Sequence, residues 1–336
     1  MRSEGNTVLD IQDLTIRFHM RQGLVTAVDG LELSLEEGRV LGVVGESGCG
    51  KSVMSRALIR IEAPGTIEKG RVRYIDRDGC EVAIEKLDPA GPDIRRIRWK
   101  EIAMIFQEPM ASFGPQHTFG EQIAEAMELH GILCGRNRRE AVVASLDSVR
   151  MPRPRETAEQ YPYQLSGGMR QRAMIAMALS CGPRILIADE PTTALDVSTE
   201  SQILDLLRER QKDLGMSILY ISHNLGVVAH IADDVAVMYL GRVVERASVR
   251  VLFAAPKHPY TLALLRSIPR VDRDIPGRLE VLSGSLPDPF ARPAGCVFHQ
   301  RCPECISGLC DRVVPPCVHL DDGSTVTCHL YGGEHA

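Results

Sequence analysis

A glycine-rich segment near the start of the chain combines the residue types that bind phosphate. Residues 45–52 read Gly-Glu-Ser-Gly-Cys-Gly-Lys-Ser, which fits the pattern G-x-x-x-x-G-K-[ST]. Its glycines let successive backbone N–H groups point at one anion, and a helix that starts there adds its positive end. Lys51 can reach the outer phosphates, and the Ser52 hydroxyl can bind Mg²⁺. A turn without a ligand is the alternative, but an apolar strand before the motif and a helix after it favour a nucleoside triphosphate site.

Two carboxylates could complete such a site. Asp189 and Glu190 follow the apolar run 185–188. One carboxylate can hold the Mg²⁺ hydration shell, and a second can polarise the attacking water. An isolated Asp-Glu pair is more often a solvated strand end, but its place after a strand in a chain with a phosphate loop favours the catalytic interpretation. The predicted contacts to the nucleotide and its metal are Gly45, Ser47, Gly48, Cys49, Gly50, Lys51, Ser52, Val53 and Asp189.

The elements that position these residues can be predicted from the pattern of apolar residues. Short apolar runs at 40–44, 185–188 and 218–221 are typical of buried parallel strands, and each ends in a polar cluster. Helices are expected at roughly 119–130, 138–149, 168–180 and 200–213. Strands that alternate with helices predict an α/β fold, in which ligands bind beyond the carboxyl ends of the strands.

Residues 165–172, Leu-Ser-Gly-Gly-Met-Arg-Gln-Arg, resemble the LSGGQ signature of ABC transporter ATPases, in the form found in oligopeptide and dipeptide importers. Other motifs of that family follow in the expected order. Phe18 stands where an aromatic ring stacks on adenine, although tyrosine is commoner there. Gln107 matches the Q-loop, Asp196 the D-loop and His223 the switch histidine, which Asn224 follows where aspartate is usual.

The resemblance implies a P-loop, RecA-like ABC ATPase core over 7–250, with an antiparallel β-subdomain and a helical signature subdomain at about 110–178. It implies that Lys51, Glu190 and His223 are catalytic, and that Gln107 binds Mg²⁺ together with Ser52. The signature starts a second helix, so one chain carries two half-sites for phosphate. In the family, two subunits meet head to tail and the signature caps the partner's ATP. The residues assigned to that contact are Ser166, Gly167, Gly168 and Gln171.

The last part of the chain, 251–336, is expected to be a small loop-rich domain. Residues 256–269 contain His-Pro-Tyr at 258–260 and resemble the C-terminal region of oligopeptide importers, and six of the ten cysteines follow. By that resemblance, Cys296, Cys302, Cys310 and Cys328 would bind a [4Fe–4S] cluster. Zinc held by Cys302 and Cys305 with His299 or His319 is the alternative, and free thiols are the third.

Composition narrows the class of protein further. A net charge of −5 gives no basic field, so nucleic acid is not expected as a partner. No apolar run reaches the ~20 residues of a membrane span, and the first residues show no secretory signal. The resemblance implies a peripheral subunit on the cytoplasmic face of the bacterial inner membrane. Its implied partners are a paralogous or identical ATPase, two transmembrane permeases and an extracytoplasmic solute-binding protein.

The expected function is ATP-driven import of dipeptides or oligopeptides. Nickel chelates, opines and oligosaccharides are alternative cargoes, because the binding protein and not this subunit selects the solute. A soluble ABC ATPase of DNA repair is disfavoured, because such proteins insert a long coiled coil between phosphate loop and signature, and the interval from 52 to 165 is too short for one. A translation-type ABC protein is disfavoured because it would carry two ATPase cassettes, and this chain has one. An inactive assembly module is disfavoured by Lys51, Glu190 and His223.

Overall fold

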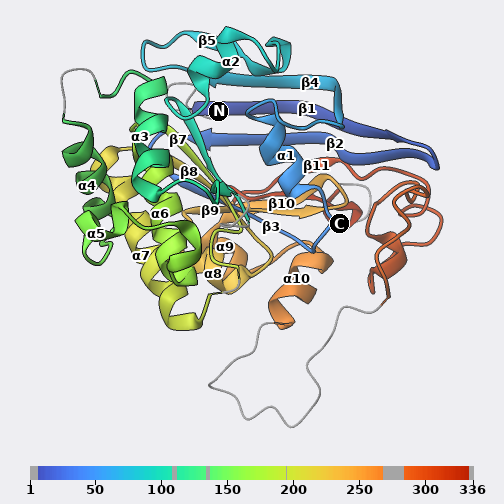
Figure 1. The fold of residues 1–336 in the computed structure, drawn as a ribbon. Coiled ribbons are helices and arrows are strands. Elements are labelled where there is room, and N and C mark those ends of the chain that lie inside the picture. Colours follow the sequence, from blue (N-terminus) through green and yellow to red (C-terminus); the bar gives the residue numbers. More distant parts are fainter. Residues whose placement is uncertain (1–6, 108–111, 134–136, 194, 268–283, 333–336) are drawn as a thin grey trace.

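A computed structural model describes residues 7–107, 112–133, 137–193, 195–267 and 284–332. Two sheets form the centre of the molecule (Figure 1). The smaller sheet is antiparallel, in the order β2-β1-β4-β5, and the larger has the order β11-β12-β10-β9-β3-β8-β7-β6. The strands are β1 (Thr7–Met20), β2 (Gly23–Glu36), β3 (Val40–Val44), β4 (Thr66–Ile75), β5 (Glu81–Ala83), β6 (Ile102–Ile105), β7 (Ile185–Asp189), β8 (Ser217–Ser222), β9 (Asp234–Tyr239), β10 (Arg242–Ser248), β11 (Cys317–His319) and β12 (Thr325–Thr327).

The middle of the large sheet is parallel. β3 pairs with β8 on one side and β9 on the other, and β7 joins β8 to β6. Every residue of β3, β6, β7 and β8 is buried, as expected for strands that are covered on both faces. The three strands predicted from apolar runs are therefore confirmed, and their carboxyl ends lie along one edge of the sheet.

Helices cover the sheet and build a separate layer. They are α1 (Lys51–Ala57), α2 (Pro92–Ile97), α3 (Phe119–Leu129), α4 (Arg138–Ser148), α5 (Pro154–Ala158), α6 (Gly167–Leu179), α7 (Val197–Leu214), α8 (Leu225–Ile231), α9 (Val249–Ala254) and α10 (Pro259–Arg266), with short 3₁₀ turns η1 (Ile84–Lys86), η3 (Pro162–Gln164), η4 (His299–Arg301) and η5 (His329–Tyr331). The four helices predicted from the sequence correspond to α3, α4, α6 and α7. Local sequence explains the start of α3, where Thr118 and Glu121 form a capping box.

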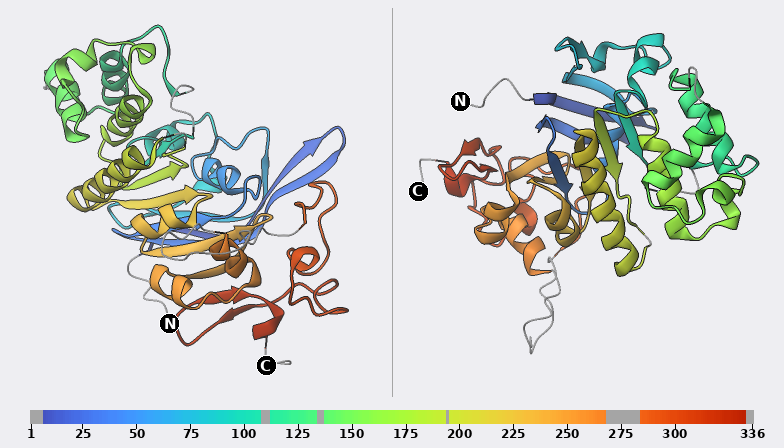
Figure 2. Two further views of the ribbon diagram at one scale, coloured as in Figure 1. Left: turned by 90° about the horizontal axis from the view of Figure 1, so that it is seen from below. Right: turned by 90° about the vertical axis from the view of Figure 1, so that its left-hand side faces the viewer.

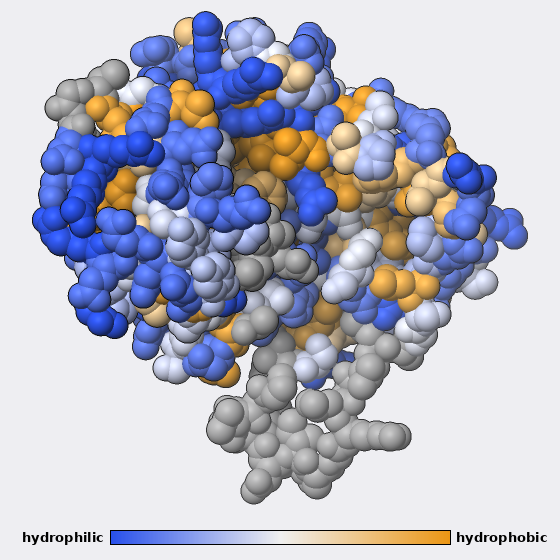
Figure 3. Space-filling model, viewed as in Figure 1, coloured by the Kyte–Doolittle hydropathy of each residue, from blue (hydrophilic) through white to orange (hydrophobic). Residues whose placement is uncertain are grey.

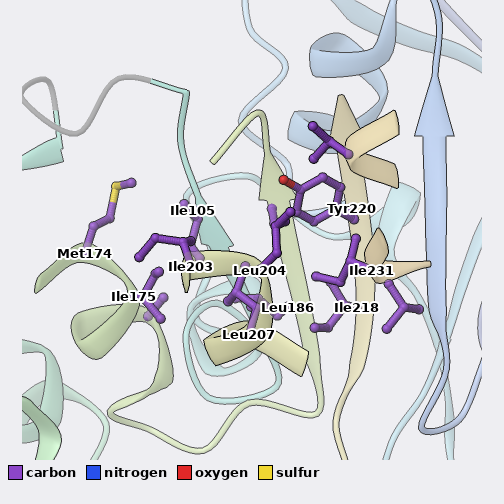
Figure 4. Packing of buried hydrophobic residues seen from close by; sticks show 14 of the residues in the cluster. Ile105, Met174, Ile175, Leu186, Ile203, Leu204, Leu207, Ile218, Tyr220 and Ile231 are labelled. Atoms are coloured by element: carbon purple, nitrogen blue, oxygen red, sulfur yellow. The ribbon is translucent and has the colours of Figure 1, made fainter. Parts of the chain in front are cut away.

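Apolar side chains join the sheet to the helices on one face. Figure 4 shows this core, in which side chains of β6, β7 and β8 point toward α6, α7 and α8. The labelled residues are Ile105, Met174, Ile175, Leu186, Ile203, Leu204, Leu207, Ile218, Tyr220 and Ile231. A second cluster fills the space between the two sheets and includes Leu41, Val43, Met54 and Ile187. The predicted α/β fold, with its antiparallel and helical parts, is confirmed.

The C-terminal region is more closely joined to the core than the sequence suggested. β12 pairs with β10, at Glu245 with Val326, so the last strands extend the large sheet. Phe298 and Val326 are almost completely buried, and Phe298 belongs to the main core. The physical reason is that β10 would otherwise be an open sheet edge, which β12 covers.

The helical layer and the cysteine-rich region lie at opposite ends of the molecule. Both views in Figure 2 place α3 to α6 at one end and the segment after residue 284 at the other. Within the described ranges, no helix is long and apolar enough to cross a membrane.

Candidate nucleotide site

The phosphate loop lies between the end of β3 and the start of α1. Its shape requires glycine, since a Cβ on Gly45 would collide with the carbonyl oxygen of Met238, and one on Gly50 would collide with that of Ala27. Lys51 is 4% exposed, and its Nζ donates hydrogen bonds to the carbonyl oxygens of Gly45 at 2.8 Å and Glu46 at 3.0 Å. The lysine is therefore folded over the loop, at the place where a phosphate would meet it.

The hydroxyl of Ser52 faces the carboxylate at the end of β7. Ser52 Oγ donates to Asp189 Oδ1 at 3.1 Å. Asp189 is 2% exposed, and this burial raises its pKa, which the hydrogen bond from Ser52 counteracts. Hydroxyl and carboxylate oxygens are the donors that Mg²⁺ prefers, so the two side chains fit a magnesium site.

Glu190 is the centre of a second polar cluster. Its Oε2 accepts hydrogen bonds from Gln107 Nε2 at 3.0 Å and from Thr193 Oγ1 at 3.2 Å, and it lies 3.2 Å from His223 Nδ1. Gln107 comes from the end of β6 and His223 from the end of β8, so three neighbouring strands deliver the group. Thr193 was not predicted; its only sequence signal is its place three residues after Glu190, in the same turn.

The backbone of Glu190 is held in an unusual conformation. Its φ of 48° lies in the left-handed region, and its N–H donates to the carbonyl of Ile221 at 2.9 Å. Residues with such backbone angles cluster at functional sites, because the surroundings must enforce them. The link to β8 aims the carboxylate toward Gln107 and His223.

The signature residues lie in another part of the molecule. Ser166 caps α6 by accepting the N–H of Met169 at 3.4 Å, and both Ser166 and Gly167 are exposed. α6 packs with α3, α4 and β6, whereas α1 packs with β2 and β7. The side chain of Gln171 is buried at 2% exposure inside the helical layer, so it offers no surface to a neighbouring subunit.

The structure also locates the residues predicted for the D-loop and for the adenine contact. Asp196 caps α7, accepting the N–H of Thr199 at 2.9 Å and its hydroxyl at 2.7 Å, and these bonds lower the pKa of Asp196. Residue 194, the first of the D-loop motif, lies outside the described residues. Phe18 stands near the end of β1, and a Cβ on Gly65 would come within 2.8 Å of its ring. Figure 3 shows apolar side chains in a hollow over α1 and the antiparallel sheet.

The C-terminal region touches the phosphate loop, which the sequence did not predict. Tyr260 is fully buried, and its Oη accepts the backbone N–H of Glu46 at 2.9 Å. His258 is 1% exposed, and its Nδ1 accepts the N–H of Tyr260 at 3.1 Å. Burial lowers the pKa of His258 to about 3, so the ring is neutral and can accept this bond. The His-Pro-Tyr motif thus holds a tyrosine against the loop.

The structure separates the six late cysteines into distinct environments. Cys296, Cys310 and Cys328 are buried, Cys302 is half-buried, and Cys305 and Cys317 are exposed. Each of the four less exposed sulfurs accepts a backbone N–H, from Phe298, Glu304, Ile306 and Leu330. Burial raises the pKa of Cys296 to about 11 and of Cys302 to about 12, and nearby thiolates add to both shifts. Across the described part of the chain, no three His, Cys, Asp or Glu side chains are grouped to hold a metal ion.

Comparison with known proteins agrees with this geometry. The model of the ABC transporter family matches residues 28–193, and that of the oligopeptide/dipeptide transporter C-terminal region matches 244–310. The dipeptide transport ATP-binding protein DppD of Bacillus subtilis is 43% identical over 98% of this chain and 97% of its own. The oligopeptide transport ATP-binding protein AppD of the same organism is 41% identical over 98% of this chain and 99% of its own.

Solved structures resemble the larger part of the molecule. The dimeric, ADP- and phosphate-bound ATP-binding cassette MJ0796 superposes with a TM-score of 0.61 at 26% identity, covering 72% of this chain and 99% of that one. The fold and site define an ABC-type ATPase. The chain belongs to the ATP-binding proteins of the oligopeptide and dipeptide ABC transporter family, as the sequence predicted, and is an ATP-hydrolysing subunit.

Proposed function

We propose that this chain powers an importer of dipeptides or oligopeptides by binding and hydrolysing ATP at the cytoplasmic face of the membrane. The observation that carries the proposal is the convergence of Lys51, Ser52 and Asp189, and beside them the Glu190 cluster, at the carboxyl ends of neighbouring strands. The region that matches oligopeptide transporters and the names of the relatives support the peptide cargo.

In this mechanism each cluster has a separate task. The loop from Gly45 to Val53 binds the triphosphate, with Lys51 neutralising its charge and Phe18 stacking on adenine. Ser52 and Gln107, with Asp189 beside them, would hold Mg²⁺, which supplies further neutralisation of the phosphate oxygens. Glu190 orients and polarises the attacking water, and His223 contacts the γ-phosphate. The hydrogen bonds from Gln107 and Thr193 to Glu190, and its contact with His223, hold its carboxylate in position before the nucleotide arrives.

The second half of the site comes from another subunit. Ser166, Gly167 and Gly168 present backbone and hydroxyl donors at an exposed helix start, away from this chain's own phosphate loop. We propose that a paralogous ATPase, or a second copy, meets this chain head to tail and that Asp196 lies at that interface. Val197, beside it, is 83% exposed, which suits a surface covered by a partner.

The remaining partners follow from the importer assignment. Residues 7–250 form the motor, and the helical layer within about 110–178 meets two transmembrane permeases. An extracytoplasmic binding protein would select the solute. Gln107 joins β6 to the segment that leads into this layer, so its bond to Glu190 links permease movement to the catalytic cluster.

The cargo is tested by co-purifying the complex with its permeases and screening the matching binding protein by thermal shift. Peptides should raise the melting temperature of the binding protein and stimulate ATP hydrolysis by the complex in vesicles. A response to nickel chelates, opines or oligosaccharides and not to peptides would refute the cargo while leaving the ATPase intact. Glu190→Gln should abolish the stimulated ATP hydrolysis. Equal hydrolysis rates in the wild type and in this variant would show that Glu190 is not catalytic.

We further propose that Cys296, Cys302, Cys310 and Cys328 hold a [4Fe–4S] cluster. The proposal is supported by the backbone N–H groups that bond to these four sulfurs, since such bonds accompany thiolate ligation. A four-iron cluster takes one thiolate per iron, so its ligands surround it and need not meet at one ion. The bound cluster would give a region built mainly of loops a rigid centre.

Anaerobic purification tests this second proposal. Wild-type protein should absorb at about 400 nm and contain iron and sulfide, and Cys302→Ser should lose both. Cys317→Ser is the matched control, because Cys317 is exposed and lies outside the group of bonded sulfurs. Zinc in place of iron would support the alternative site with Cys305, and loss of the absorbance in Cys317→Ser would contradict the ligand set.

A further inference from the structure

One arginine of the cysteine-rich region forms an ion pair with a residue of the phosphate loop. Arg301 lies directly before Cys302, and its two terminal nitrogens pair with both carboxylate oxygens of Glu46, at 2.7 and 3.0 Å. Glu46 is the second residue of the phosphate loop, and it precedes Arg301 by 255 positions. Because Tyr260 accepts the backbone N–H of Glu46, the C-terminal region holds this residue by both its side chain and its main chain.

The pair is well shielded from solvent and geometrically fixed. The Arg301 side chain is 5% exposed and that of Glu46 is 24% exposed. Arg301 also donates to Tyr239 Oη at 3.4 Å, and its guanidinium lies 5.9 Å from the centre of that ring. Tyr239 in turn packs against Tyr260 and Phe298, with ring centres 4.8 and 5.2 Å away. A two-point ion pair in such a setting fixes orientation as well as distance.

Glu46 passes this constraint on to the catalytic lysine. Its carbonyl oxygen accepts the hydrogen bond of Lys51 Nζ at 3.0 Å. The peptide group between Gly45 and Glu46 is therefore held by Tyr260 through its N–H, and its own carbonyl oxygen, that of Gly45, accepts a hydrogen bond from Lys51 Nζ at 2.8 Å. Rotation of this peptide would move the lysine and change the curve of the loop that must receive the triphosphate.

We propose that Arg301 is a positioning residue for ATP: through Glu46 it keeps the phosphate loop in its binding conformation, so that nucleotide affinity depends on the cysteine-rich region. The inference uses ATP binding by the family and does not depend on the identity of the cargo or of the group bound by the cysteines.

The test compares Arg301→Gln with Arg292→Gln in the full chain. Arg292 also joins the C-terminal segment to the core: it donates to the carbonyl oxygens of Leu240 at 2.6 Å and Thr26 at 3.4 Å and pairs with Asp29 at 3.0 Å, and none of these three partners belongs to the phosphate loop. Binding is followed with a fluorescent ATP analogue and Mg²⁺, together with KM and kcat for ATP and the melting temperature. Arg301→Gln should raise Kd and KM about tenfold with a smaller change in kcat, and Arg292→Gln should leave Kd within about twofold.

Two further variants separate positioning from a general loss of stability. Glu46→Gln removes the same ion pair while keeping the bond to Tyr260, so it should reproduce the increase in Kd, and the double variant should add little. Arg301→Lys should restore part of the affinity. Equal losses of melting temperature in both arginine variants without a change in Kd would overturn the proposal. If Arg301→Gln does not fold, an unchanged Kd in Glu46→Gln overturns it by itself.

Discussion

The two helix starts that we assign to phosphate binding differ in almost every respect. At the phosphate loop, Lys51 is buried and donates hydrogen bonds to loop carbonyls. The C-terminal region holds the same loop through the ion pair of Arg301 with Glu46. At the signature, Ser166 and Gly167 are exposed, and the nearby Arg170 and Arg172 donate to backbone carbonyls of Pro162 and Val149. The signature therefore presents the neutral hydroxyl of Ser166 and the N–H groups of a helix start, whereas the loop adds the buried positive charge of Lys51.

This difference explains why two subunits are needed. A buried lysine with a braced loop can bind a triphosphate alone, because charge and geometry are already in place. Neutral N–H groups in open solvent bind phosphate weakly, since water competes for them and screens the helix dipole. The signature can act only when a partner delivers the phosphate and excludes the water.

The largest effect should come from the catalytic carboxylate. Glu190→Gln keeps the size of the side chain but removes the base, so kcat should fall about 10²- to 10³-fold while ATP still binds. With MgATP the variant should accumulate as a dimer, measured by light scattering. Thr193→Val, which removes one donor to Glu190 and leaves the carboxylate, is the control and should lose far less activity.

The signature can be broken without disturbing the fold. A Cβ on Gly167 would meet nothing within 4 Å, so Gly167→Asp should fold normally. In the dimer its charge would oppose the partner's γ-phosphate, and hydrolysis should fall about 10- to 100-fold. ATP affinity of the monomer should stay within about twofold of wild type. A matching loss of monomer affinity would show that the two half-sites are not separate.

Acid should destabilise the contact of the His-Pro-Tyr motif with the phosphate loop, because His258 is buried as a neutral ring. The pKa of His258 is about 3, below its ordinary value of 6.5, because burial favours the neutral ring. Below pH 6.5 the unfolded chain binds a proton at this histidine that the folded chain does not. The free energy of unfolding therefore decreases as the pH falls from 6.5 toward 3. The contribution is about 1.4 kcal/mol per pH unit. Urea unfolding between pH 6.5 and 4.5 should show a shallower pH dependence in His258→Asn, and equal slopes would contradict the assignment.

The smallest effect is expected at the adenine position. Stacking needs only the face of an aromatic ring, so Phe18→Tyr should change the Kd for ATP by less than about twofold. Phe18→Ala should weaken binding about tenfold or more, because it removes the ring. If both variants bind like wild type, Phe18 does not contact the base.

Much of the fold was predictable because its signals are local. The apolar runs of β3, β7 and β8 and the helices α3, α4, α6 and α7 follow from hydrophobic pattern and capping residues. The contacts of the C-terminal region with the core could not be predicted from local signals. The pairing of β12 with β10 joins residues 325 and 246, and no local pattern specifies such a partner.

In the candidate site, too, the residues with a local sequence signal were predicted and those without one were missed. Motifs predicted Lys51, Asp189, Glu190 and His223 as site residues, because nucleotide chemistry demands those residue types at those strand ends. Thr193 was missed because a threonine in a turn carries no chemical signal. Gln171 was assigned to the subunit contact by its place in the motif, although its helical phase directs the side chain into the core.

The sequence by itself determined which groups this protein brings to ATP, since glycine geometry, a lysine and paired carboxylates are properties of short segments. Tertiary structure alone decided that Arg301 and Tyr260 meet Glu46, and that the last strands complete the main sheet. Contacts between distant segments depend on how the whole chain packs. Their energy is gained only when burial brings the partners together, and a local pattern contains no record of it.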